Sequence, residues 1–373
     1  MIDVLLDPNN PVMWLFIISL VAGAIAVISR PFSSYVKFVY PNAKYEAMGN
    51  PYLNQTSLQK LLETGSLQGF IEQLNNNKDY PIQGKNASEV QHQLDLLYVK
   101  TIEQMKNDNS KKMHSFYDTI IECHDLPIMK TVIKLKRKQK NIDESLIQQP
   151  ISKKIKSYIE RISNVEQEEF LQVLKDFGLP LNYIDLIKNE DTTDEEIDAQ
   201  TDRFYMQQLH NVKVPYKCQQ AKHLYIKRLI DIKSIELLLR AKQRKIPEEQ
   251  CLNLFIDEGY EILEWKFKEL AKADDITEII NMLEGTSYAT MLKHVSDTSK
   301  TKSVQPYTDA LSQYMLTIMK NISSQHYTTI GPSLRFIHSK ETEITNLKII
   351  AKGLSENMAA DTIKPLLRLE DTK

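Results

Sequence analysis

Apolar residues recur at three- and four-residue spacing along most of the chain, and polar residues fill the positions between them. This period matches one face of an α-helix, whereas a β-strand would alternate apolar and polar residues. Two polar stretches without the period, 75–86 and 296–307, predict loops. The sequence therefore predicts an all-α body over residues 33–373.

Capping residues predict where several helices begin and end. A capping side chain is followed three residues later by Glu or Gln at Asn164 with Gln167, Thr193 with Glu196, and Asp275 with Glu278. Pro247, followed by two glutamates, is typical of a first helical turn. Three glycines are predicted helix ends: Gly65, Gly178 and Gly353.

The segment 11–29 contains no charged residue. Nineteen helical residues at about 1.5 Å each just cross a hydrocarbon core of about 30 Å, so the segment predicts one transmembrane helix. The residues expected to anchor it are Trp14, Leu15, Phe16, Ile17 and Ile18, with Trp14 at the interface. The alternatives are a cleaved signal peptide, with Ala22-Gly23-Ala24 as the cleavage site, and a buried core helix.

The charges that flank this segment predict its orientation. Asp3 and Asp7 precede it, whereas Arg30, Lys37 and Lys44 follow it. The positive-inside rule then places the short N-terminus outside and the body in the cytoplasm. The lack of Lys or Arg before the segment disfavours a signal peptide. We therefore expect a single-pass protein of the cell membrane with its body on the cytoplasmic side.

Two internal matches predict a repeat. The segment 231–240 aligns with 343–352, and both run from an acid through apolar residues to a base. Their counterpart at 127–136 has Pro127 in place of the acid. Residues 67–80 also align with 276–288, and both segments end in tyrosine. Together these matches predict an N-terminal segment 1–32 and three similar helical units at 41–150, 151–262 and 263–373, although amphipathic helices also resemble one another by chance.

Composition removes several classes of function. Glycine makes up only 10 of 373 residues and forms no G-x-G, so Rossmann and Walker phosphate loops are excluded. The net charge of −2 gives no general attraction to nucleic acid, and no nucleic-acid partner is expected. Cys123, Cys218 and Cys251 are too far apart in sequence for a C-x-x-C site. The histidines show no metal-binding spacing either, and we expect no metal and no cofactor.

Three local clusters of functional groups receive structural interpretations. Cys123, His124 and Asp125 have the residue types of a catalytic triad, but helical neighbours point about 100° apart. A basic run is interpreted as a solvated helix face: Lys130, Lys134, Lys136, Arg137, Lys138 and Lys140. An acidic stretch is interpreted as a helix start favoured by the helix dipole: Glu190, Asp191, Asp194, Glu195, Glu196 and Asp198. No catalytic residue is predicted.

Three segments together resemble one family. Residues 332–348 resemble an apolar helix running into K-E-x-E-I-x-N-[LI]-[RK], which here places Lys340, Glu341, Glu343, Asn346 and Lys348. Asp202 and Tyr205 resemble a D-x-x-Y motif, and residues 230–242, with Asp231 and Arg240, resemble I-D-x-x-N-[IL]-x-x-[LI]-[LI]-R-x-K with Ser234 in place of Asn. Residues 40–48 resemble Y-x-x-A-x-x-x-A-M.

These motifs are similar to those of the C subunit of the archaeal-type (A-type) rotary ATP synthase, which is itself similar to the d subunit of V-type ATPases. The resemblance spans about residues 35–370 and marks a helix-packing scaffold. It implies three helical units arranged as a funnel. The N-terminal apolar helix departs from the family pattern, because many relatives lack it.

The resemblance also implies a function and partners. Such a protein would be a non-catalytic central-rotor subunit that seats the central shaft on the membrane proteolipid ring and transmits torque between ion translocation and ATP synthesis or hydrolysis. Its partners would be the proteolipid ring, the central-shaft subunits and, through the N-terminal helix, membrane lipid, with one copy in each complex. The alternatives are a membrane-tethered helical adaptor and, if the surroundings of Cys123 prove reactive, a membrane-anchored hydrolase.

Overall fold

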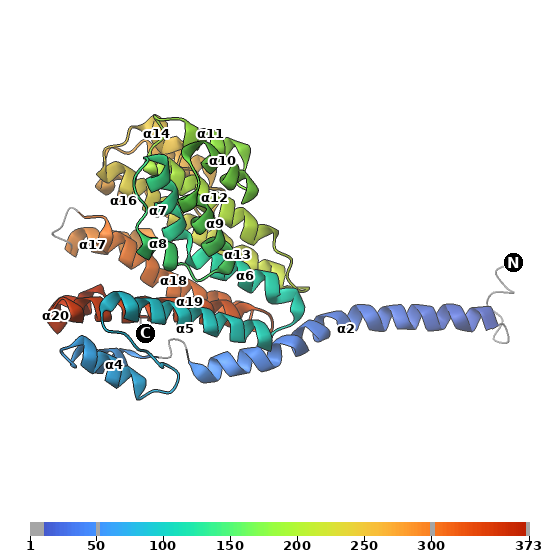
Figure 1. The fold of residues 1–373 in the computed structure, drawn as a ribbon. Coiled ribbons are helices and arrows are strands. Elements are labelled where there is room, and N and C mark those ends of the chain that lie inside the picture. The colour runs from blue at the N-terminus through green and yellow to red at the C-terminus, as the bar shows by residue number, and fades with distance from the viewer. Residues whose placement is uncertain (1–10, 50–52, 299–302, 371–373) are drawn as a thin grey trace.

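The computed structural model describes residues 11–49, 53–298 and 303–370, and all regular elements in these ranges are helices (Figure 1). The prediction of an all-α chain is therefore confirmed. Asp3, Asp7 and the side chain of Arg30, on which the predicted orientation partly depends, lie outside the described residues.

The helices follow one another in this order. The N-terminal part contains α2 (Pro11–Met48), α3 (Gln55–Leu62), α4 (Leu67–Asn75), α5 (Ala87–Asp108), η1 (Lys111–Met113), α6 (His114–His124) and α7 (Leu126–Arg137). The middle part contains α8 (Glu144–Gln148), α9 (Lys153–Asn164), α10 (Gln167–Asp176), α11 (Leu181–Lys188), α12 (Asp194–Asn211), α13 (Cys218–Gln243) and α14 (Glu248–Leu252). The C-terminal part contains α15 (Glu264–Ala271), α16 (Ile276–Met282), α17 (Ala289–Thr298), α18 (Gln305–Gln325), α19 (Gly331–Ser355), α20 (Ala360–Ile363) and η2 (Lys364–Leu366).

Helix α2 has two different halves. Its apolar part, Pro11–Ser29, is long and apolar enough to cross a membrane, and none of it is buried against the body. The alternative of a buried core helix is therefore wrong. The other half packs against α19 and α5, where Phe38 and Tyr45 are each only 1% exposed. Figure 1 shows the apolar half extending away from the body as one continuous rod.

One packing arrangement occurs three times in the body. Helix α7 packs against α9, α10 and α12; helix α13 packs against α15, α16 and α18; and helix α19 packs against α3, α4 and α5. In the first two cases the helix contacts elements that follow it in the chain. In the third case the C-terminal helix α19 returns to the N-terminal elements, and Figure 1 shows α19 beside α5. The order of contacts is therefore closed, with α19 joining the two ends of the body.

Most of the predicted helix boundaries agree with the structure. Thr193 and Glu196 form a full capping box, and Asp275 caps α16 through the N–H of Glu278 at 2.9 Å. The Asn164 prediction is wrong, because Asn164 is the last residue of α9 and α10 begins after Glu166 without a side-chain cap.

The Gly353 prediction is also wrong, because this residue lies inside α19 and does not end it. A Cβ there would approach Ile363 Cδ1 to 2.6 Å, so the glycine permits close packing of α20 on α19. By contrast, Gly65 and Gly178 have φ of +68° and +91° and follow α3 and α10, as predicted.

Candidate functional site: buried carboxylates and a basic end

The first feature of the site is a fully buried carboxylate, Asp231, on α13. Its Oδ1 accepts the N–H of Ile262 at 2.8 Å, and its Oδ2 accepts the Tyr288 hydroxyl at 2.9 Å. The N–H of Glu261 lies 3.1 Å from Oδ2. Since residues 261 and 262 immediately precede α15, the carboxylate fixes the start of the α15–α16 helix pair on α13.

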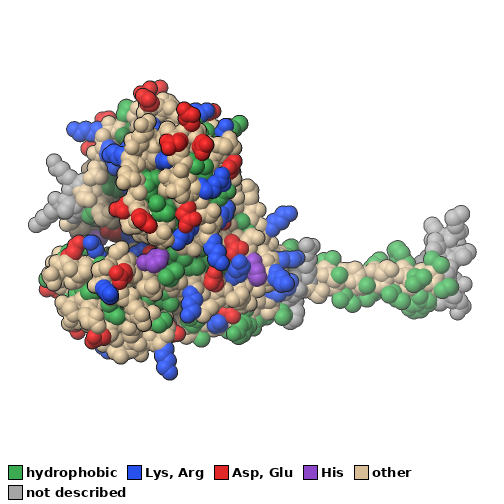
Figure 2. All heavy atoms as spheres, viewed as in Figure 1, with side chains coloured by type: hydrophobic (Ala, Val, Ile, Leu, Met, Phe, Trp, Pro, Cys, Tyr) green, Lys and Arg blue, Asp and Glu red, His purple; other side chains and the backbone are tan. Residues whose placement is uncertain are grey.

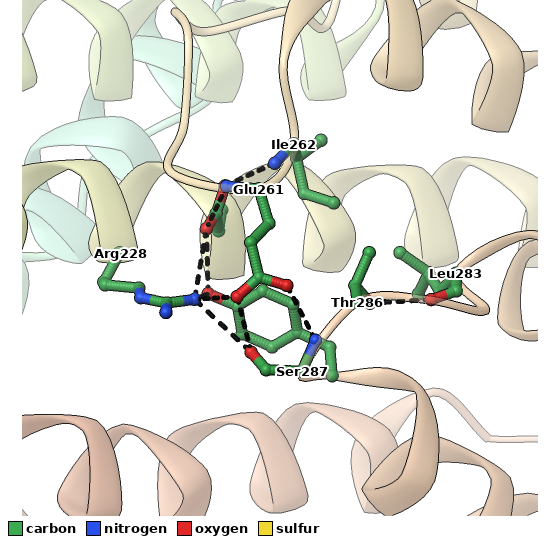
Figure 3. Close-up of polar contacts among 8 residues, drawn as sticks. Arg228, Glu261, Ile262, Leu283, Thr286 and Ser287 are labelled. Carbon is green, nitrogen blue, oxygen red and sulfur yellow. Dashed lines mark hydrogen bonds and ion pairs between the residues drawn. The ribbon is translucent and has the colours of Figure 1, made fainter.

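The surroundings of Asp231 compensate only part of the cost of burying it. Burial raises the pKa of this carboxyl, whereas the hydrogen bonds from Ile262 and Tyr288 act in the opposite direction. Figure 3 shows Arg228, Glu261 and Ser287 converging. Glu261 forms an ion pair with Arg228 and accepts the N–H of Ser287 at 2.6 Å. This network is therefore a partly buried ionic junction between α13, the loop before α15 and the loop before α17.

A second carboxylate, Glu343 on α19, makes the equivalent contacts at the other end of the chain. It is 2% exposed and accepts the N–H of Leu53 at 2.9 Å, just before α3. It also accepts the hydroxyl of Tyr80 and an ammonium hydrogen of Lys340, whose Nζ lies 2.5 Å away. The sequence repeat aligns Asp231 with Glu343 and Tyr288 with Tyr80, and the structure brings the two matches together.

A third carboxylate, Asp125, lies between α6 and α7 and is 1% exposed. It accepts the N–H of Ile151 at 3.0 Å and that of Ser152 at 2.6 Å, immediately before α9. The repeat alignment places Pro127 where the acid is expected, but the carboxylate is supplied two residues earlier. We refer to the contacts of Asp125, Asp231 and Glu343 with the backbone as the carboxylate junctions.

The neighbours of Asp125 do not form a triad with it. His124 Nε2 lies 3.1 Å from Asp95 Oδ1, while Asp125 binds backbone N–H groups. Burial lowers the pKa of His124, but the hydrogen bond and charge of Asp95 outweigh it, so this pKa lies above its usual 6.5. Burial strongly raises the pKa of the Cys123 thiol, which opposes formation of a nucleophilic thiolate.

The remaining residues of the C-terminal motif hold α19 to two other segments. Lys348 Nζ lies 2.9 and 2.8 Å from the two oxygens of Asp95 on α5. Asn346 binds the backbone of Arg368 twice, donating to its carbonyl at 2.7 Å and accepting its N–H at 2.9 Å. Glu341 is less enclosed, with 42% of its side chain exposed and His338 Nδ1 at 3.6 Å.

The other motif residues lie on α12 and α13. Tyr205 is fully buried and donates to Met129 Sδ at 3.7 Å. Arg240 is 47% exposed and lies 3.9 Å from Glu236, which is a weak surface pair. Asp202 is 4% exposed and lies 2.6 Å from Lys130 Nζ on α7. Tyr205 and Asp202 therefore join α12 to α7, whereas Arg240 pairs within α13, and the three residues do not converge on a cavity.

The pair of Asp202 and Lys130 belongs to a ladder that corrects the interpretation of the basic run. Two lysines on α7 and the lysine directly after it meet three aspartates on α12: Lys130 with Asp202 at 2.6 Å, Lys134 with Asp198 at 2.8 Å, and Lys138 with Asp194 at 2.7 Å. The numbers rise by four on one helix and fall by four on the other, as expected for antiparallel helices. The basic run is therefore mainly an internal contact surface, and its description as a solvated face is wrong. The acidic stretch does begin a helix, α12, as predicted.

The second feature of the site is the end of the body from which α2 departs. Three loops gather at the base of α2: 109–113, which includes the short helix η1, 212–217 and 326–330. Asn42 Nδ2 donates to the carbonyls of Tyr327 and Thr329 at 2.7 and 2.9 Å, and Asn109 Nδ2 donates to the Tyr45 hydroxyl at 3.1 Å. The charge of Lys37 also reaches the Cys218 thiol, whose pKa burial nevertheless raises to about 12.

These three loops, which we call the basic end, have a one-sided composition. Their exposed side chains include Lys111, Lys112, Lys213, Tyr216, Lys217 and Tyr327. None of the three loops contains Asp or Glu. Figure 2 shows Lys and Arg side chains gathered where the apolar helix leaves the body. The sequence analysis missed this surface, although the recurrence of Lys and Tyr in acid-free loops was a usable signal.

Within the described residues, no group of three or more His, Cys, Asp or Glu side chains is arranged to hold a metal ion. The arrangement consists of helix-fixing carboxylates, an acid-free end and a projecting apolar helix. These features are typical of an all-helical structural protein.

A family model described as ATP synthase (C/AC39) subunit matches residues 41–366. The chain belongs to this family, whose members are non-catalytic subunits of rotary ATP synthases. It is similar to the A-type ATP synthase C subunit of Methanosphaera stadtmanae, at 25% identity over 97% of this chain and 96% of the relative. It is also similar to the A-type C subunits of Methanocaldococcus jannaschii, at 25% identity over 96% and 94%, and of Pyrococcus horikoshii, at 26% over 89% and 90%.

The comparisons also bear on α2. Two of these matches cover 97% and 96% of this chain. The residues that they leave uncovered are fewer than the 19 residues of Pro11–Ser29, so each match includes part of that segment. The relatives from Methanosphaera and Methanocaldococcus therefore extend into this segment. As part of an ATP synthase, the chain has partner subunits and is membrane-associated.

Proposed function

We propose that this chain is the central-rotor subunit that seats the shaft of an A-type ATP synthase on the membrane proteolipid ring and transmits torque between them. The observation that carries the proposal is the closed order of helix contacts, in which α19 returns to α3, α4 and α5. A part that transmits torque must resist twisting about its axis. A closed arrangement has no free end from which the packing could open, so load is shared among its junctions.

The carboxylate junctions support a division into three units at 41–150, 151–262 and 263–373. Asp125 binds residues 151 and 152, and Asp231 binds residues 261 and 262, so both junctions coincide with the proposed boundaries. Glu343 then joins the third unit to the first through Leu53. In this interpretation Asp125 holds the start of the second unit, Asp231 holds the end of the second unit next to the third, and the three units surround the axis of a funnel.

The basic end is the surface that we assign to the ring. Lysine and tyrosine without neighbouring acids suit an edge that offers carboxylates and backbone carbonyls. The opposite side would receive the central-shaft subunits, with one copy of this chain in each complex. The apolar half of α2 would span the cell membrane once and contact lipid or membrane subunits, with the body on the cytoplasmic side.

The proposal is tested by photocrosslinking in the assembled complex. A photoreactive amino acid would replace Tyr327, which is 50% exposed in the basic end, and the matched control would replace Tyr260, which is equally exposed in the loop before α15. We expect Tyr327 to give adducts with the proteolipid and Tyr260 to give none. Because both partners rotate together, the adduct should leave ATP hydrolysis unchanged. Adducts between Tyr327 and a stationary subunit, or loss of hydrolysis on forming the proteolipid adduct, would refute the proposal.

A further inference from the structure

The contacts of α2 fix its apolar half rigidly to the body. Phe38 is buried, Asn42 binds two carbonyls of the 326–330 loop, and Tyr45 stacks on Phe336 with ring centroids 5.0 Å apart. Lys44 pairs with Asp108 at 2.6 Å on α5. The helix is thus held from two sides within its last three turns.

No break in the helix separates this attachment from the apolar half. Helix α2 is continuous for 38 residues, so Ser29, the last residue of the apolar half, lies only about 14 Å along the axis from Phe38 at 1.5 Å per residue. Pro31 lies in this connecting stretch, lacks one helical backbone hydrogen bond and can bend the helix there, but α2 continues through it and joins the two halves as one element. Any rotation of the body is therefore transmitted to the apolar half.

The apolar half is exposed on all its sides. Four consecutive residues, Leu15, Phe16, Ile17 and Ile18, are 65, 68, 39 and 60% exposed. Consecutive helical residues are about 100° apart, so these four sample the whole circumference. Any membrane-spanning helix needs such a surface, because lipid or apolar protein surrounds it on every side. The described surface suits surroundings that are apolar in every direction.

From this geometry we propose that the apolar half of α2 lies inside the lumen of the proteolipid ring, as an axial pin. The inference rests on the proposed function, because it requires that the body rotates with the ring. A rigidly attached helix outside the ring would be carried around its perimeter on every turn and would collide with any stationary subunit that touches the ring there. On the axis, the same helix turns in place and meets the ring on all sides.

The position of α2 among the three loops of the basic end agrees with an axial site. Its base contacts the 326–330 loop through Asn42 and the 109–113 loop through Tyr45, and Lys37 lies near the start of α13, after the 212–217 loop. A helix that leaves from among the loops that sit on a ring enters that ring near its centre. The basic end then forms the seat around the pin.

A four-position photocrosslinking scan tests the pin. A photoreactive amino acid is placed in turn at Leu15, Phe16, Ile17 and Ile18 in the full chain, within the assembled complex in membranes. We expect proteolipid adducts from all four positions, none with stationary membrane subunits, and ATP hydrolysis retained after illumination. A helix lying against the outside of the ring would give proteolipid adducts from one or two adjacent positions only.

Three outcomes would overturn the pin: adducts confined to one side, adducts with lipid alone, or any adduct with a stationary subunit. The probe at Tyr327 separates this failure from failure of the proposed function. If Tyr327 labels the proteolipid while the α2 positions do not, the rotor assignment stands and the axial pin is wrong. If none of the positions labels the proteolipid, both are wrong.

Discussion

The carboxylate junction at Asp231 can be tested by removing the carboxylate and, separately, by crowding it. Asp231→Ala deletes the acceptor for the N–H groups of Glu261 and Ile262 and for the Tyr288 hydroxyl. Gly259→Ala keeps the acceptor but places a Cβ 1.9 Å from Asp231 Oδ1, well inside van der Waals contact. The double variant removes both the acceptor and the atom with which the new Cβ collides.

The expected magnitudes follow from these contacts. Removing one member of a buried, hydrogen-bonded ionic network costs about 3–5 kcal/mol, because the remaining donors lose their partner without regaining water. The Gly259→Ala collision forces the loop off the carboxylate and should cost about 2–3 kcal/mol, in the range of overpacking. In the double variant the collision with Asp231 is absent. Its loss of stability should therefore be smaller than the sum of the losses of the two single variants by at least about 1 kcal/mol.

The assay is chemical denaturation of the full chain in mild detergent, followed by helical circular dichroism, for the parent, both single variants and the double variant. Loss of the junction should lower the free energy of unfolding and detach α15–α16 first, seen as faster amide exchange in that helix pair. Additivity of the two changes within about 0.5 kcal/mol would show that Gly259 and Asp231 do not interact, and would refute the reasoning.

Three further outcomes are expected in the same assay. Asp202→Ala leaves the nearly buried Lys130 ammonium unpaired and should lower the free energy of unfolding by about 3–5 kcal/mol. The double change Asp202→Leu with Lys130→Met should lower it much less, and equal losses would contradict a buried pair. Leu347→Ala empties a fully buried site and should lower the free energy of unfolding by about 2–5 kcal/mol. The control Leu181→Ala, at a 69% exposed position, should lower it by less than about 0.5 kcal/mol. Similar losses would mean that α19 buries another side. Protonated His124 is stabilised in the folded state, so its contribution to stability is complete below pH 6.5 and is lost as the pH rises through its raised pKa. The difference in stability between the parent and His124→Gln should therefore shrink over that pH range. A constant difference would exclude the charge of His124 as the cause.

The sequence predicted those parts of the fold that depend on local chemistry. The helical period identified an all-α chain, and the Thr193 capping box was predicted correctly because all its atoms lie within one turn. The sequence match between the segments of Asp231 and Glu343 pointed to two equivalent carboxylates. In the structure each of them accepts a hydrogen bond from the tyrosine of the second match, Tyr288 or Tyr80. Asp125 was missed because its position is shifted by two residues from the alignment.

Contacts between distant segments were the part that the sequence did not reveal. The lysines of α7 looked like a solvated face because a single helix pattern does not show what faces it. Their aspartate partners lie more than fifty residues away, and only the shared four-residue spacing on both helices pointed to the pairing. Gly353 was misinterpreted for a similar reason, since its role is to admit Ile363 from another helix.

The use of buried carboxylates at the junctions, in place of apolar contacts alone, has a mechanical consequence. Burial raises the pKa of Asp125 and of Asp231, so placing a charge there is costly and the backbone donors offset only part of that cost. Apolar side chains can slide past one another with little change in energy, whereas a carboxylate that binds particular N–H groups fixes which residue begins the next helix pair. Under a twisting load, apolar packing would resist compression and the carboxylates would resist slippage, which is the property that the proposed position between a shaft and a ring would require.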